Sequence, residues 1–461
     1  MASIPSQTLP AAQPHRAGKL KKISLIPFIA ILYAYCAGGP FDYEAMVSTS
    51  GPGMALLFIL IVPWLFSVPM ALASAEMATA MPVEGGFYRW TRAAFGDFWG
   101  FQCGWWNWTG TFFMWASYGV VLADYVAQVT PVHSRFAHWA IAVIFLMLVA
   151  GLNILGIRLV GRLTLVLLVL QMLPVAAFVY LGFTHAHFNP FHPWMPPGRP
   201  WREVYGVGLA LALWIYSGYE QLSTVIEEVE EPTRNFPRGL AIVVPLAAVI
   251  YFLPMAAGLA ALGNWQEWQT AYLVTAGRLL GGSSMGLAMF AGAALCAFVL
   301  LDATVLSVSR VPFTMADDGY LHSSLARLHP RFGTPVLAIV ISTLFCSLLA
   351  LGSVIQLIAI YAWMRSATSV LTLISLWRLR RVAPEIQRSF VVPGGKAGLA
   401  AVVLIPTLLF AWALINSDPA SRLWGIACLA LGPVAYYFGK RRQAATNPGA
   451  APVNVAPRIN G

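Results

Sequence analysis

Charged side chains are scarce in this chain of 461 residues, because Asp, Glu, Lys and Arg together make up only 10% of it. A soluble domain carries roughly a quarter, and 59% of this chain is hydrophobic, so a water-soluble globular core is excluded. Cysteine is also scarce: the five cysteines show no CxxC spacing, so neither a zinc site nor a disulfide framework is indicated. We therefore expect no metal and no cofactor.

Apolar runs recur along the whole chain, each close to the roughly 20 residues that a helix needs to cross a bilayer. This pattern predicts an all-α membrane protein with twelve transmembrane helices. The predicted spans cover residues 23–47, 54–75, 98–129, 136–156, 160–183, 205–227, 240–262, 285–308, 335–351, 355–377, 399–415 and 423–438.

The distribution of lysine and arginine predicts how these spans are oriented. With the N-terminus inside, five of the 28 basic residues fall in outer segments, Arg365 falls within a span, and all the others lie in inner segments. Cytoplasmic loops of membrane proteins carry such an excess. We therefore expect cytoplasmic tails at 1–22 and 439–461, in a multi-pass protein of the plasma membrane. Anionic lipid at the inner leaflet explains the net charge of +10 without nucleic acid.

Glycine and proline interrupt two of the predicted spans near mid-depth. Backbone in lipid must find its hydrogen bonds within the protein, so such breaks are typical of places where backbone lines a cavity. Their matching positions favour two inverted repeats of five helices, at 23–183 and 204–378, followed by two accessory helices at 398–438. Simple kinks are the alternative. The breaks are Tyr35-Cys36-Ala37-Gly38-Gly39-Pro40-Phe41 and Tyr216-Ser217-Gly218-Tyr219-Glu220.

Ionisable residues inside the predicted spans are candidates for binding or proton coupling, because their burial in lipid is costly. Glu220 follows the second break, where it either takes up a proton or bonds backbone amides at a helix end. Of the two carboxylates after the first break, Asp42 and Glu44, we expect Glu44 to face the pathway. Asp302 and Arg365 are expected to neutralise each other, with a role in proton relay as the alternative.

Three local patterns resemble the amino acid, polyamine and organocation permeases, and the resemblance covers essentially all twelve spans. The Gly-Gly-Pro-Phe turn at 38–41 with Glu44, and the stretch 94–102, are similar to the LAT-like and polyamine-uptake members of that family. The three patterns are the first break at 37–41, the loop Pro-Val-Glu-Gly-Gly-Phe-Tyr at 82–88, and the sixth span at 216–220 with its exit, Glu228, Pro232, Arg234, Pro237 and Arg238.

The resemblance implies a LeuT-like fold with a 5+5 inverted repeat, broken helices 1 and 6, and a substrate site at the breaks. It also implies that the first break binds a carboxylate or its equivalent and that Tyr216 closes over the substrate. The resulting candidates for substrate binding are Ala37, Gly38, Gly39, Phe41, Glu44, Tyr216, Ser217, Gly218 and Glu220. Gln171 aligns with the fifth-span position that serves ion coupling in relatives, so the coupling candidates are Glu220, Glu44, Gln171, Asp302 and Arg365.

We expect a secondary active transporter rather than an enzyme, because the sequence has no HExxH motif and no large soluble domain. Half-helix N-termini at a break attract a carboxylate and freed carbonyls attract an ammonium group, so a zwitterionic amino acid fits both. Proton-coupled uptake of amino acids by alternating access is the leading hypothesis, with sodium as the other coupling ion. The alternatives are uptake or exchange of polyamines such as putrescine or spermidine, with Glu44 and Glu220 as cation partners, and a membrane-embedded substrate sensor.

Overall fold

The computed structural model describes residues 22–41, 43–130, 134–417 and 419–446. Within these ranges the chain is helical, apart from loops and one isolated β-bridge between Ile23 and Val229. The α-helices are α1 (Leu25–Cys36), α2 (Ala45–Ser50), α3 (Pro52–Val62), α4 (Val68–Ala80), α5 (Gly86–Phe95), α6 (Asp97–Val129), α7 (Arg135–Ile154), α8 (Ile157–Thr184), α9 (Trp201–Ile215), α10 (Pro232–Leu262), α11 (Tyr272–Val308), α12 (Arg310–Asp317), α13 (Val336–Leu349), α14 (Val354–Val382), α15 (Gly395–Ile415) and α16 (Pro419–Thr446).

The prediction of an all-α membrane protein is confirmed, and a helix covers at least part of each predicted span. Among the described residues, seven segments are long and apolar enough to cross a membrane. α1, α13 and the part of α9 from 204 to 215 are apolar but shorter, and α1 and α9 are short because each ends at a break. The seven segments are Pro52–Ala80, Arg135–Ile154, Ile157–Thr184, Pro232–Leu262, Tyr272–Asp317, Gln356–Val382 and Gly395–Ile415.

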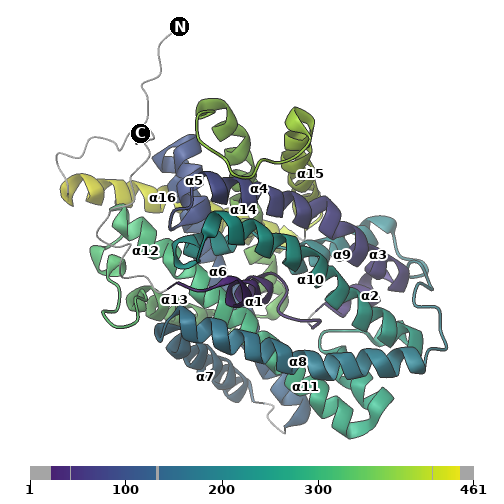
Figure 1. Cartoon of the computed structure of the whole chain (residues 1–461). Coiled ribbons are helices and arrows are strands. Elements are labelled where there is room, and N and C mark those ends of the chain that lie inside the picture. Colours follow the sequence, from purple (N-terminus) through teal and green to yellow (C-terminus); the bar gives the residue numbers. More distant parts are fainter. Residues whose placement is uncertain (1–21, 42, 131–133, 418, 447–461) are drawn as a thin grey trace.

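The helix α1 lies inside a shell of longer helices (Figure 1). It packs against α8, α10 and α11, and most of its residues are buried. Around it, α11 packs along α8, and α14 packs along α6. This arrangement places the end of α1, and with it the first break, in the interior of the protein.

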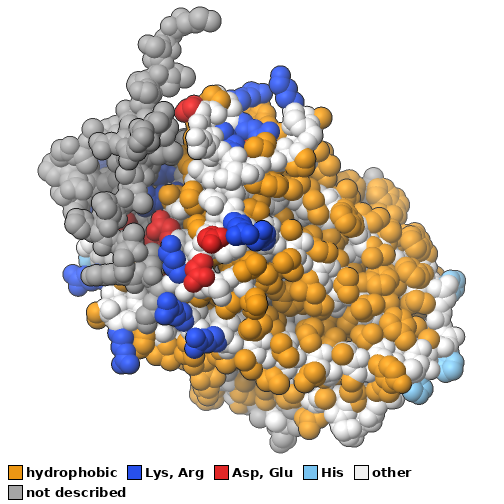
Figure 2. All heavy atoms as spheres, in the orientation of Figure 1, with side chains coloured by type: hydrophobic (Ala, Val, Ile, Leu, Met, Phe, Trp, Pro, Cys, Tyr) orange, Lys and Arg blue, Asp and Glu red, His pale blue; other side chains and the backbone are white. Residues whose placement is uncertain are grey.

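The outer surface is largely apolar, as the fold of a lipid-embedded protein requires. Figure 2 shows hydrophobic side chains over a broad face of the molecule, with lysine, arginine and acidic side chains gathered toward one side of that view. Large side chains such as Ile144 on α7, Leu173 on α8 and Leu408 on α15 are more than half exposed. A soluble monomer rarely exposes so much contiguous apolar surface, so this surface is suited to contact with lipid.

Candidate functional site

Both predicted breaks are present as non-helical backbone. α1 ends at Cys36 and the next helix, α2, begins at Ala45, with Gly38 between them at a φ of 64°. α9 ends at Ile215, and a 3-10 helix, η2 (Gln221–Glu228), begins after Gly218, whose φ is 114°. Residues with a Cβ rarely adopt these positive φ values, so both positions favour glycine.

The space around each of these glycines excludes a side chain as well. A Cβ on Gly38 would lie 2.3 Å from Leu300 Cγ, and a Cβ on Gly218 would lie 2.6 Å from Tyr35 Cε1. Leu300 belongs to α11, whereas Tyr35 belongs to α1 just before the first break. The second break therefore packs directly on the helix that carries the first, and the two breaks form one site.

Tyr251, on α10, links the two breaks by hydrogen bonds. Its hydroxyl donates to the carbonyl oxygen of Ala37 at 2.8 Å and lies 3.2 Å from that of Ile215. Tyr43 in turn donates to the Tyr251 carbonyl at 2.7 Å. At the first break, Gln171 of α8 also donates through Nε2 to the Gly38 carbonyl. Carbonyls that have lost their helical partners are thus satisfied by side chains from α8 and α10.

A small cavity of about 30 Å³ lies at the junction of the two breaks. This volume is close to that of one water molecule and far below the roughly 300–1,000 Å³ of small-molecule sites, so the site must open to admit an organic substrate. Residues at the C-terminal ends of α1 and α9 line it, together with six aromatic side chains. The lining residues are Tyr35, Cys36, Ala37, Phe41, Met114, Tyr118, Trp214, Ile215, Ser217, Tyr251, Leu300 and Tyr361.

Glu220 and Arg365 form a buried ion pair close to this cavity. Arg365 Nη2 lies 2.7 Å from Glu220 Oε1, and Ser369 Oγ donates to the same oxygen at 2.8 Å. The prediction that Asp302 and Arg365 neutralise each other is therefore wrong. Arg365 forms its ion pair with Glu220, whereas the Asp302 carboxyl group is hydrogen-bonded to Asn153 and Thr164. Their depth along the sequence did not reveal these partners.

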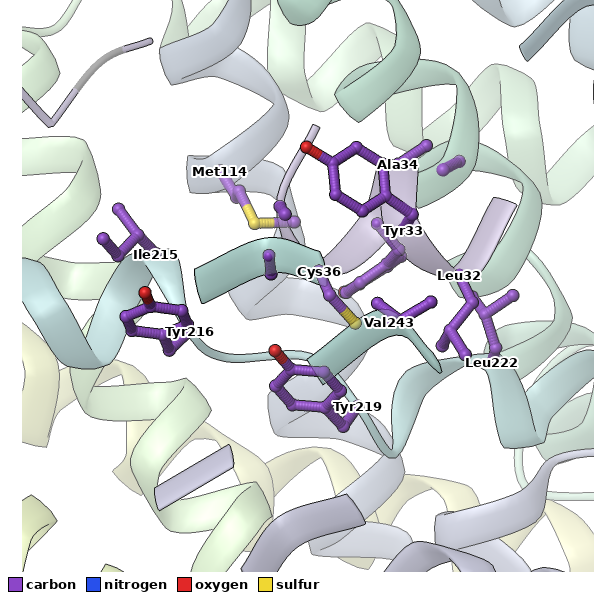
Figure 3. Close-up of a cluster of buried hydrophobic side chains, with 14 of the residues drawn as sticks. Leu32, Tyr33, Ala34, Cys36, Met114, Ile215, Tyr216, Tyr219, Leu222 and Val243 are labelled. Carbon is purple, nitrogen blue, oxygen red and sulfur yellow. The ribbon is translucent and has the colours of Figure 1, made fainter. Parts of the chain in front are cut away.

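Tyr216 lies behind the cavity wall in this conformation. Its hydroxyl donates to the Ile59 carbonyl at 2.9 Å, and Ser67 donates to the Tyr216 carbonyl at 3.3 Å. Ser67 ends a π-helical turn, η1 (Pro63–Ser67), between α3 and α4, and such turns recur at functional sites. In Figure 3 the rings of Tyr216 and Tyr219 lie on the segment that follows α9, with Cys36 of α1 nearby.

The other residues expected from the sequence fall in and around the same region. Ala37, Phe41 and Ser217 line the cavity. Gly39 lies against Gln171, since a Cβ there would be 3.1 Å from Gln171 Nε2. Glu44 is fully buried at the start of α2. Asp42 lies outside the described residues.

Sequence reasoning did not select several residues of the cavity wall. Tyr35 is the first residue of the first break and Trp214 lies two residues before the second, so their positions were a usable signal. Tyr118, Tyr251 and Tyr361 belong to α6, α10 and α14, three helices far apart in sequence. Only the packing of the bundle brings these three side chains to the cavity.

The fold and the site together define a class of protein: a multi-pass helical membrane protein whose two broken segments meet at an interior cavity is a transporter. The chain belongs to the amino acid permease family, whose sequence pattern matches residues 23–432. That family has the LeuT-like fold, and its members are transporters rather than enzymes.

Curated relatives extend over most of the chain. The polyamine transporter PUT1 of Oryza sativa subsp. japonica is 30% identical over 438 residues, which cover 92% of this chain and 80% of the relative. The polyamine transporter RMV1 of Arabidopsis thaliana is 29% identical over 436 residues, covering 92% and 87%. An uncharacterized transporter of Mycobacterium tuberculosis is 28% identical over 349 residues, covering 75% of each chain.

Proposed function

We propose that this protein is a secondary active transporter that takes up polyamines by alternating access, with protons as the coupling ion. We propose that its twelve transmembrane helices comprise a 5+5 inverted repeat and two accessory helices. It would span the plasma membrane with both termini in the cytoplasm. The names of the relatives favour polyamines over the amino acids that the sequence motifs suggested.

The cavity wall is the observation that carries this proposal. The C-terminal ends of two half-helices, α1 and α9, meet there, and a helix C-terminus carries a partial negative charge. Six aromatic rings surround the same space, and the face of an aromatic ring attracts an ammonium group by about 0.5–2 kcal/mol. Both features favour an organic cation.

Amino acids are the second candidate, because Arg365 has unused hydrogen-bonding capacity. In the described part of the chain, its Nε and Nη1 atoms have no hydrogen-bond partner although the residue is buried. A guanidinium with free donors is suited to a substrate carboxylate. Arg365 lies one helical turn from Tyr361, which lines the cavity.

Uptake into proteoliposomes tests the proposal. We expect labelled spermidine to accumulate when the lumen is alkaline relative to the medium, and we expect unlabelled putrescine to compete more strongly than leucine. Strong competition by leucine alone would instead support amino acid transport. Substrate binding without flux would indicate a sensor, and accumulation that needs sodium and ignores the pH gradient would contradict proton coupling.

Two variants of Trp214 test the aromatic part of the site. Trp214→Phe retains a ring face at the cavity, whereas Trp214→Leu removes it. We expect the leucine variant to lose about two- to thirtyfold in spermidine affinity, the range of one cation–π contact, and the phenylalanine variant to lose less. Equal affinities for both variants would argue against recognition of the amine by this ring.

A further inference from the structure

The carboxyl group of Asp302 lies apart from the cavity and is buried between three helices. It belongs to α11 and is fully buried. Asn153 of α7 donates through Nδ2 to Asp302 Oδ1 at 2.6 Å, and Thr164 of α8 donates through Oγ1 to Oδ2 at 3.1 Å. Both oxygen atoms of the carboxyl group are thus held by neutral polar groups.

Three other buried carboxylates of the described residues, Glu76, Glu220 and Glu228, differ from Asp302 because each has a guanidinium partner. An ionised carboxylate can persist in the interior when a cation is hydrogen-bonded to it, but without one it is strongly disfavoured. The pairs are Glu76 with Arg380 and Arg388, Glu220 with Arg365, and Glu228 with Arg310.

The surroundings of Asp302 supply no cation among the described residues. The polar side chains that contact its carboxyl group, Thr164 and Asn153, are both neutral. Arg158 and Arg162 of α8 are both exposed. Other titratable side chains on elements that pack against α11 are Tyr33, Tyr35 and Cys36 on α1; Asp97, Cys103, Tyr118, Asp124 and Tyr125 on α6; Arg135 and His138 on α7; Tyr180 on α8; Glu227 and Glu228 on η2; Arg234, Arg238 and Tyr251 on α10; and Arg310 and Asp317 on α12.

This environment suits a carboxyl group that gains and loses a proton. The Thr164 hydroxyl donates to an ionised carboxylate and accepts from a protonated one, so it serves both forms. In the packed conformation the neutral form is favoured, because a lone charge in a lipid-embedded interior costs several kcal/mol. Ionisation therefore requires water to reach Asp302, which requires the packed helices to separate.

The helix that carries the first break also covers the region next to this carboxyl. Gly161, one turn before Thr164 on α8, lies against Pro27 and Ile31 of α1, since a Cβ there would be 3.2 Å from Pro27 Cβ and 3.3 Å from Ile31 Cδ1. Gly38 at the end of α1 lies against Leu300, two residues before Asp302 on α11. A movement of α1 would alter both the cavity and the packing beside Asp302.

We propose that Asp302 is the proton-binding site through which proton movement is coupled to substrate movement. The inference rests on the proposed proton-coupled transport and adds to it the residue that carries the proton. On the side of uptake a hydronium ion gives its proton to the carboxylate, so an O–H bond breaks in hydronium and one forms at Asp302. The neutral carboxyl group allows α1 to pack against α8, and on the side of release the proton passes from Asp302 to water. No electron is transferred. Since protonation stabilises one conformation over the other, the pH gradient shifts the conformational equilibrium.

The variant Asp302→Asn tests this role, because an amide resembles the protonated carboxyl group but cannot release a proton. In proteoliposomes we expect it to exchange labelled spermidine for unlabelled spermidine at a rate close to that of the wild type. We expect it to lose accumulation driven by a pH gradient. Thr304→Val is the matched control, because Thr304 is also buried on α11 but bonds only the Leu301 carbonyl among the contacts described, and it should retain both activities.

A second variant keeps the test decisive if Asp302→Asn does not yield folded protein. Thr164→Val retains the carboxylate but removes a donor to its ionised form. We expect spermidine uptake by this variant to reach half its maximum at a higher pH than in the wild type. An unchanged pH profile in Thr164→Val would overturn the proposal.

The remaining outcomes separate this inference from the proposed function. Gradient-driven accumulation in folded Asp302→Asn would overturn the role of Asp302 while leaving proton-coupled transport intact. Loss of exchange in the folded variant would also overturn it, because the residue would then serve substrate movement itself. If the wild-type protein neither takes up spermidine nor responds to the gradient, the proposed function itself fails.

Discussion

At the residue scale, the pairing of Glu220 with Arg365 determines what the second break can do. Both groups are almost completely inaccessible, and the pair joins the segment after Gly218 to α14. Ser369, one turn beyond Arg365, adds a third contact on the same oxygen atom. Glu220 therefore has a counter-ion from the protein itself.

The variant Glu220→Gln should lower both stability and transport. It leaves Arg365 buried without its counter-ion, and breaking a buried ion pair costs about 3–5 kcal/mol. Thermal unfolding in detergent and spermidine uptake in proteoliposomes measure the two effects. The double variant Glu220→Gln with Arg365→Gln removes both charges and should recover much of the lost stability without recovering uptake. Transport at the wild-type rate in Glu220→Gln would contradict a role at the site.

At the scale of elements, the beginning of α1 is attached to the chain that leaves the second break. Ile23 donates to the Glu228 carbonyl at 2.9 Å, and Glu230 donates to the Ile23 carbonyl at 3.0 Å. Glu228 is held in turn by Arg310 of α12, with Nε 3.0 Å from Oε1. The two broken segments are thus joined at this end as well as at the cavity, and this junction must open for α1 to move independently.

A pair of matched substitutions measures this junction. Glu228→Gln should destabilise the protein by about 3–5 kcal/mol, because Arg310 is buried and would lose its ionised partner. Glu231→Gln breaks the pair with Arg234, which is more than half exposed, and should cost about 1 kcal/mol or less. Thermal unfolding of the two variants in the same detergent compares them. Equal losses of stability in Glu228→Gln and Glu231→Gln would contradict a larger contribution from the buried ion pair.

At the scale of the whole molecule, the basic residues predict which loops face the cytoplasm. Gln266 follows α10 and Ser323 follows α12, and both side chains are exposed. We expect Gln266→Cys to react with a membrane-impermeant maleimide in intact cells, whereas Ser323→Cys should react only after permeabilisation. Labelling of both sites in intact cells, or the reverse order, would contradict the proposed orientation.

The fold was largely predictable from local sequence. In lipid, a run of apolar residues such as 160–183 must form its backbone hydrogen bonds within itself, which a helix does. The helical class and the approximate positions of the spans therefore follow from the sequence. The breaks were also predictable, because Gly38 and Gly218 interrupt otherwise apolar segments. The tertiary structure brings the two breaks together, because Gly218 packs against Tyr35 of α1.

The pairing of buried charges could not be predicted in the same way. Asp302 and Arg365 looked complementary because both lie deep in apolar segments, yet depth along a helix does not tell which face of that helix a side chain occupies. Arg365 instead reaches Glu220, 145 positions earlier in the chain. Partners of this kind depend on how the helices are rotated against one another, which is decided by the packing of many weak contacts.

Composition and local pattern alone determined that this protein is helical, that it is embedded in lipid, and that two of its helices are interrupted. Each of these properties follows from the solvation of a short segment, so a local sequence contains the required information. Only the tertiary structure decided which aromatic side chains surround the cavity, that Tyr251 joins the two breaks, and that Asp302 lies without a cation among the described residues. These properties depend on contacts between helices distant in sequence, whose free energy belongs to the packed bundle as a whole.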